Sequence, residues 1–165
     1  GMAIKLLGMV RKNENGFFTI VAPFMIPLEH PLASVNKVFN AIVVHGNMLG
    51  NTMFYGKGAG KEATASAVVG DLIDCVIHAG SHIEVNMNAE PAQLSDNGSF
   101  VHRFFVRVPE ESADAALEAF GDGIEHITAE DVAGEFAFVT DLISEKHFHE
   151  AYEKLDRAKG YIRLL

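Results

Sequence analysis

Four mainly apolar segments in the first half of the chain are bounded by turn residues, a pattern that is typical of β-hairpins. They cover residues 3–11, 17–22, 38–45 and 52–56. The first two flank Asn15-Gly16, a dipeptide that favours tight turns, and the last two flank the short loop GNMLG. Between the pairs, Pro23, Pro27 and Pro31 predict irregular structure before about residue 32. We therefore expect an antiparallel sheet of about four strands.

From residue 63 onward the period changes to that of a helix. Apolar residues recur on one helical face, namely Ala65, Val68, Val69, Leu72, Ile73 and Val76. Asp71 and Asp74 lie on the opposite face, where a solvated surface explains them better than a pair of acid–base carboxylates. This helix is expected to cover one face of the sheet.

The second half predicts a compact β-α-β-β-α-β order, which is that of a ferredoxin-like domain. The expected strands are 101–108, 124–128, 135–140 and 161–165, and the expected helices are 110–120 and 144–158. Residues 84–99 are polar, without a period, and contain Pro91 and Gly98, so they predict a linker. The expected fold class is α+β: an antiparallel sheet covered by a helix, followed by the β-α-β-β-α-β domain.

Composition and charge restrict the function. A chain of 165 residues with 48% hydrophobic content can bury one moderate core or two small ones. The net charge of −9 divides into +3 for residues 1–60 and −12 for residues 61–165, which argues against nucleic acid as a partner. No apolar run reaches the ~18 residues of a membrane span, and no signal peptide is evident. The single cysteine, Cys75, is expected in the core and fits a cytoplasmic protein.

The segment FYGKGAGKEATASAVVGD, residues 54–71, resembles a phosphate-binding loop that leads into a helix. It is not a P-loop, because Gly56 and Gly60 enclose three residues and Glu62 follows Lys61 where a hydroxyl is needed. The spacing of the glycines also differs from the G-x-G-x-x-G fingerprint of dinucleotide-binding folds, because the third glycine, Gly60, comes one residue early. Two interpretations remain open: a glycine-rich strand-to-helix turn, which the local sequence favours, or a loop whose backbone approaches a ligand at a helix N-terminus.

Eight histidines raise the question of a metal site. His147 and His149 are two apart on an expected helix and so point to different faces, while His78 and His82 have no carboxylate at ligand-like spacing. We expect no metal site and assign no catalytic residue.

Residues 26–74 read IPLEHPLASVNKVFNAIVVHGNMLGNTMFYGKGAGKEATASAVVGDLID. This run resembles the end of the substrate-binding domain of the homoserine dehydrogenase family. In many members an ACT domain of β-α-β-β-α-β topology follows, and residues 100–165 are similar to it. The resemblance implies a substrate-binding and dimerisation part over residues 1–83, a linker over 84–99 and an ACT-like domain over 100–165.

The family reduces aspartate semialdehyde to homoserine with NADPH or NADH, on the route to threonine and methionine. The resemblance covers only the back portion of such an enzyme, without its Rossmann domain or the segment with the active-site lysine. It implies that Gly58, Ala59, Gly60 and Thr64 approach the cofactor, NADP or NAD, and that His30 and Pro31 face the substrate cleft. The chain alone is therefore expected to be inactive and to bind no cofactor.

The place of the ACT ligand loop reads PEESAD, residues 109–114. It has no glycine, and Glu110, Glu111 and Asp114 would repel the carboxylate of an amino-acid effector. We therefore expect a homodimer without an amino-acid effector. The alternative is a free-standing, non-catalytic module for regulation or assembly that derives from this enzyme.

Overall fold

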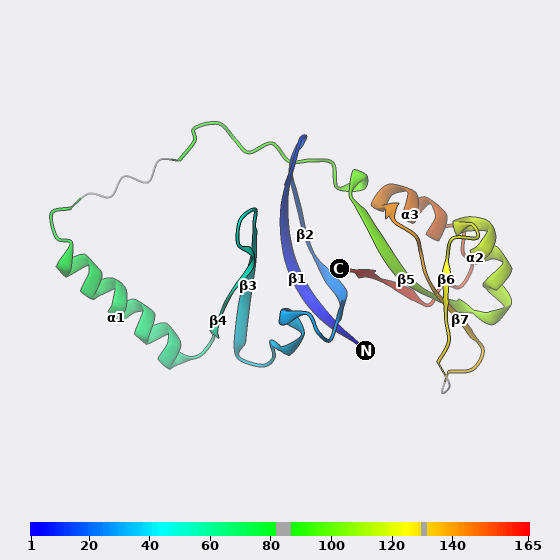
Figure 1. Ribbon diagram of the computed structural model, residues 1–165, viewed down its shortest axis with the longest axis horizontal. Helices are drawn as coiled ribbons and strands as arrows, with labels where there is room; N and C mark the ends of the chain where they lie inside the picture. Colours follow the sequence, from blue (N-terminus) through cyan, green and yellow to red (C-terminus); the bar gives the residue numbers. More distant parts are fainter. Residues whose placement is uncertain (82–86, 130–131) are drawn as a thin grey trace. The chain divides into compact units, whose positions relative to one another are not determined.

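The computed structural model describes residues 1–81, 87–129 and 132–165 as an α+β fold with mostly antiparallel strands (Figure 1). This confirms the expected α+β class with a mostly antiparallel sheet. Contacts along the chain form two compact units. Unit 1 comprises residues 1–26 and 92–165, and unit 2 comprises residues 27–91. The sequence predicted residues 1–83 as one part, whereas this division groups the first two strands with the C-terminal residues. Residues 84–86 of the expected linker lie outside the described residues.

Unit 1 is built on a seven-stranded sheet with the order β1-β2-β9-β5-β7-β6 and with β8 beside β5. Its strands are β1 (Met2–Asn13), β2 (Gly16–Pro27), β5 (Val101–Pro109), β6 (Glu125–Ile127), β7 (Glu135–Val139), β8 (Ile143–Ser144) and β9 (Gly160–Leu164). β5 pairs antiparallel with β7, β8 and β9, whereas β2 runs parallel to β9. The hairpin at the N-terminus thus joins the C-terminal strands in one sheet.

Strand β2 corrects two sequence predictions. It continues through Pro23 to Pro27, where the prolines predicted irregular structure. Phe24 and Met25 pair with Arg163 and Leu164 at the far end of the chain. A partner so distant in sequence leaves no local signal. Strands β1 and β2 thus belong to the seven-stranded sheet, whereas the next two strands of the chain form a separate two-stranded sheet. The expected four-stranded sheet is therefore wrong.

Residues 92–100 lie along the start of β2 and include the 3₁₀ turn η2 (Asn97–Ser99). The amide of Phe17 donates to the carbonyl of Gln93, and the amide of Ser95 donates to the carbonyl of Phe17. The ring of Phe100 stacks on Phe18 at 3.6 Å between centroids. This part of the expected linker is therefore ordered against the hairpin.

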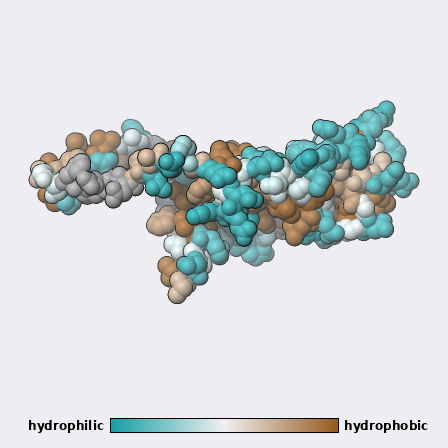
Figure 2. All heavy atoms as spheres, turned by 90° about the horizontal axis from the view of Figure 1, so that it is seen from above, coloured by the Kyte–Doolittle hydropathy of each residue, from teal (hydrophilic) through white to brown (hydrophobic). Residues whose placement is uncertain are grey.

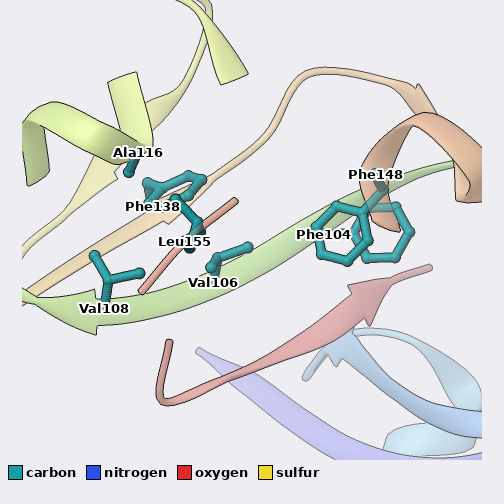
Figure 3. Close-up of a cluster of buried hydrophobic side chains, with 7 residues drawn as sticks. All are labelled: Phe104, Val106, Val108, Ala116, Phe138, Phe148 and Leu155. Atoms are coloured by element: carbon teal, nitrogen blue, oxygen red, sulfur yellow. The ribbon is translucent and has the colours of Figure 1, made fainter. Parts of the chain in front are cut away.

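Helices α2 (Ala113–Phe120) and α3 (Glu145–Tyr152) pack on one face of the sheet, and η3 (Glu110–Ser112) precedes α2. The elements β5, α2, β6, β7, α3 and β9 follow the expected β-α-β-β-α-β order, with the short β8 added. The buried cluster consists of Phe104, Val106, Val108, Ala116, Phe138, Phe148 and Leu155 (Figure 3). Unit 1 therefore has a hydrophobic core of its own.

Unit 2 contains η1 (Pro31–Ser34), the hairpin of β3 (Phe39–Gly46) and β4 (Gly50–Lys57), and helix α1 (Lys61–Ile77). The hairpin and helix form where the sequence predicted them. None of the described residues of unit 2 is buried, however. The expectation that the helix covers a sheet is therefore wrong, and so is the expectation of a buried Cys75, which is exposed. The apolar side chains of the hairpin and of α1 therefore remain exposed in the described part of unit 2.

Candidate functional site

The glycine loop connects the end of β4 to the start of α1. Gly58, Ala59 and Gly60 form this connection, and the amide of Thr64 donates to the carbonyl of Gly60 at 3.1 Å, closing the first turn of the helix. The structure thus brings the four residues that were assigned to the cofactor into one strand-to-helix junction.

Gly60 holds the conformation that the junction needs. It has a φ of 115° and a ψ of 148°, a region that residues with a Cβ rarely adopt, and it caps α1 without a side-chain hydrogen bond. The amides of Lys61, Glu62 and Ala63 precede the first intrahelical hydrogen bond, so they remain available to an acceptor outside the helix. No heavy atom would lie within 4 Å of a Cβ at Gly60, so this side of the junction is open.

Gly58 is needed for a different reason. A Cβ at this position would overlap with the side chain of Asn40, and the amide of Gly58 donates to the carbonyl of Val38 at 3.2 Å. Asn40 lies opposite Gly56 in the β3–β4 register. The sequence analysis missed Asn40, although a polar residue near the start of an apolar strand was the available signal.

The charges around the junction partly oppose one another. Lys57 ends β4 and Lys61 begins α1, so two cations flank the loop, and the positive end of the helix dipole adds to them. Glu62 in the first turn reduces this positive potential. The junction therefore offers backbone donors and a modest positive field, which suits a polar ligand more than a highly charged one.

His30 and Pro31 lie in the same unit, at the start of η1. The Nδ1 atom of His30 accepts a hydrogen bond from the amide of Leu32 at 3.2 Å, so the proton of the neutral ring is on Nε2. The backbone hydrogen bonds of His30 go to Pro27 and Ala33. These bonds remain within the segment, and those of the glycine loop involve Val38 and Thr64, so each loop is held separately.

Among residues 1–81, 87–129 and 132–165, no group of three or more histidine, cysteine, aspartate or glutamate side chains could hold a metal ion. His82, one of the histidines considered for a metal, lies outside the described residues. No helix in the described part of the chain is long and apolar enough to cross a membrane.

A buried ionic cluster in unit 1 also escaped the sequence analysis. Arg163 on β9 donates twice to the carboxylate of Glu145 at the start of α3, at 2.6 and 2.8 Å. The hydrogen bonds to Glu145 raise the pKa of Arg163. His102 on β5 has its Nε2 atom 3.7 Å from the same carboxylate, and burial lowers the pKa of this imidazole. Three residues so far apart in sequence show no recognisable spacing.

The family model described as homoserine dehydrogenase matches residues 1–73, a span that includes the whole glycine loop. The homoserine dehydrogenase of Pseudomonas aeruginosa is 37% identical over 149 residues, which are 88% of this chain and 31% of that protein. The enzyme of Lactococcus lactis is 33% identical over 138 residues, which are 82% of this chain and 32% of that protein.

Solved structures of homoserine dehydrogenases are also similar to this chain. The crystal structure of a homoserine dehydrogenase from Thiobacillus denitrificans matches with a TM-score of 0.79 and 30% identity, and covers 100% of this chain and 43% of that one. The Staphylococcus aureus enzyme at pH 6.0 matches with a TM-score of 0.64 and 27% identity. The chain spans about a third of the length of the curated relatives it matches. The chain belongs to the homoserine dehydrogenase family.

Proposed function

We propose that the 165 residues form the C-terminal part of a homoserine dehydrogenase. The whole protein reduces aspartate semialdehyde to homoserine with NADPH or NADH, in the cytoplasm, on the route to threonine and methionine. The observation that carries this proposal is the glycine junction, an open strand-to-helix connection within the residues that the family model matches. The chain contributes one wall of the cofactor site and a subunit interface, and it is inactive by itself.

The junction fits the edge of a nicotinamide cofactor. When bound, the cofactor supplies the hydride. Gly58 and Gly60 let the backbone come close to it, and the unpaired amides at the start of α1 donate hydrogen bonds. Thr64 lies one turn into the helix, with its amide already bonded to Gly60. The role of these residues is to hold the cofactor's position, since hydride transfer depends on geometry.

His30 and Pro31 border the substrate side of the site. The Nδ1 atom of His30 is engaged by the backbone, so the neutral ring presents its Nε2 hydrogen as a donor to a substrate oxygen or carboxylate. Pro31 begins η1 and fixes the backbone there. These two residues orient the substrate, and the proton donor for the reduced carbonyl is supplied by another part of the enzyme.

The exposed apolar face of α1 supports the proposal that a larger protein surrounds unit 2. Val69, Leu72, Ile73, Val76 and Ile77 line one continuous apolar surface, and Val76 is 76% exposed. Hydrophobic side chains are visible on this part of the molecule in Figure 2. A two-stranded hairpin and a single helix are marginal in water without further packing. The remaining two thirds of a homoserine dehydrogenase is the surface that we propose packs here.

We further propose that the protein forms a homodimer through unit 1. Strand β1 is an edge of the sheet, and exposed apolar residues lie on β1 and its neighbour β2, namely Met2, Ile4, Leu6, Val10 and Val21. An apolar edge strand of this length favours pairing with another copy. The ACT-like half strengthens this interface. We propose no amino-acid effector for it, because Glu110, Glu111 and Asp114 occupy η3 and the start of α2.

The second candidate function is a free-standing, non-catalytic module for regulation or assembly. The self-contained core of unit 1 favours it, since this half needs no additional chain to bury its aromatic residues. An immunoblot of source cells with an antibody raised to this chain distinguishes the two. A band more than twice the 17.9 kDa of the chain supports the enzyme, and a band of that size supports the module.

The glycine junction itself is tested in the full-length protein. Gly60→Ala should raise KM for NADPH about tenfold, because a side chain at positive φ costs roughly 1–3 kcal/mol and shifts the backbone donors. Gly56→Ala is the matched control, since Gly56 is equally open and is not at a positive φ. Equal KM values for both variants would remove the junction from the cofactor site. The 165-residue chain alone should give no NADPH-dependent reduction.

A further inference from the structure

His102 occupies an aromatic pocket where the N-terminal hairpin meets the C-terminal sheet. It is 5% exposed. Its ring lies 5.6 Å from that of Phe24 on β2, 4.8 Å from that of Phe100 and 6.2 Å from that of Phe104 on β5, measured between centroids. A titratable side chain is thus packed among apolar rings that come from the N-terminal hairpin and from the C-terminal strands.

The Nε2 atom of His102 is buried and has no hydrogen-bond partner within the part of the chain that the structure describes. The closest carboxylate oxygen, Oε1 of Glu145, is 3.7 Å away and already accepts from Arg163 at 2.6 Å. An unpaired buried ring nitrogen costs free energy, so evolution of a purely structural core favours an apolar residue at this position.

In the described part of the chain, the hairpin pairs with the rest of the sheet through β2 and β9 at two positions. The register of β2 with β9 joins Phe24 to Arg163 and Met25 to Leu164, and the amide of Leu165 donates to the carbonyl of Met25 at 3.1 Å. At the other end of β2, Phe17 forms an isolated bridge with Leu94. Side-chain packing around His102 therefore contributes a large share of what holds the hairpin in place.

We propose that His102 is a proton-sensitive latch: the neutral ring holds hairpin β1–β2 against β5 and β9, and its protonation releases the hairpin. A proton on Nε2 would introduce a charge among Phe18, Phe24, Phe100 and Phe104, and it would compete with Arg163 for Glu145.

The charged groups that face His102 come from three elements. Glu145 on α3 favours protonation, whereas Arg163 on β9 and Arg11 on β1 oppose it. Burial is the largest effect, and it lowers the pKa of His102 in the closed state below 6.5. An open hairpin restores the ordinary pKa, so acid below pH 6.5 favours the open form. Since β2 leads along the chain into η1, the latch acts on the strand that connects the two units.

The test is hydrogen exchange of the 165-residue chain between pH 5 and 7.5, with rates corrected for the intrinsic pH dependence. Protection factors of amides in β1 and β2 should fall by up to about tenfold per pH unit below 6.5, while those in β7 remain constant. His102→Phe, which keeps an aromatic ring in the pocket, should make hairpin protection independent of pH. His126→Phe is the matched control, because His126 stacks on Phe136 elsewhere in the sheet and should leave the pH response unchanged.

An unchanged pH response in His102→Phe would overturn the proposal, as would constant hairpin protection in the wild-type chain down to pH 5. If His102→Phe does not fold, NMR titration of the wild-type chain decides. The midpoint of the His102 ring resonances must then coincide with that of the hairpin amides, and distinct midpoints contradict the latch.

Discussion

Replacing Glu145 by glutamine tests the buried ion pair of unit 1. The side chain of Glu145 is 8% exposed and that of Arg163 is 14% exposed, so solvent screens their interaction poorly. Glutamine keeps one acceptor oxygen but loses the charge, and its amide group faces a guanidinium that only donates. Removing one partner of a buried pair costs about 3–5 kcal/mol, because the other charge stays buried without compensation.

The loss is measurable by thermal or urea unfolding, followed by circular dichroism. For a unit of this size each 1 kcal/mol lowers Tm by about 4–8 °C, so Glu145→Gln should lower it by at least about 12 °C. Glu125→Gln is the control, because Glu125 pairs with Arg103 at 2.9 Å on the exposed surface of the same sheet. That change should cost about 0–1 kcal/mol.

A double variant separates pairing from burial. Glu145→Leu with Arg163→Met removes both charges, and apolar replacement of a buried pair is often neutral. The double variant should therefore be more stable than Glu145→Gln. The reasoning is refuted if Glu145→Gln costs no more than Glu125→Gln. It is equally refuted if the stability that the double variant loses equals the sum of the losses of Glu145→Leu and Arg163→Met measured singly. Independent sites add within about 0.5 kcal/mol, so such a sum would mean that the two side chains do not interact.

The other expectations concern acid stability, the core and the surface of unit 2. Hydrogen bonds from Lys159 and Arg107 lower the pKa of Glu135. The stability that the ionised carboxylate contributes to the fold is therefore present above about pH 4.5 and is lost as pH falls through the lowered pKa. Acid unfolding of Glu135→Gln should lack this pH-dependent loss of stability. Phe148→Ala should destabilise unit 1 by about 3–5 kcal/mol in urea unfolding, because Phe148 is fully buried and stacked on Phe104 at 3.6 Å, and a loss below about 1 kcal/mol would contradict this packing. Leu72→Asp on α1 should leave the urea unfolding of the 165-residue chain unchanged and abolish activity in the full-length protein, whereas a fully active variant would show that nothing packs on this face.

Local patterns were sufficient to predict most elements. Apolar segments flanking a short loop predicted β3 and β4, and alternating apolar residues predicted β5 and β7. Gly16, at a φ of 122°, ends the turn that Asn15-Gly16 indicated. Helical spacing predicted α1, although the helix begins two residues earlier than expected. α3 ends at Tyr152 rather than at residue 158, and Arg157 then adopts a φ of 56°. Short-range spacing carries this information because turns and amphipathic faces are local properties.

The long-range strand pairing could not be predicted from the sequence. The parallel contact of Phe24 with Arg163 joins the two ends of the chain, and it determines both the extent of β2 and the composition of unit 1. The candidate site was predictable in part, since the glycine junction was visible as a motif, but Asn40 became relevant only when the hairpin register placed it beside Gly58. Local periodicity contains no information about such partners.

The absence of buried residues in the described part of unit 2 has a consequence for biosynthesis. Under the proposed function, this segment leaves the ribosome after the surface that covers it, so the hairpin and helix can condense onto a template that is already folded. Chains in which that template is damaged would display α1 and β3–β4 to chaperones and proteases.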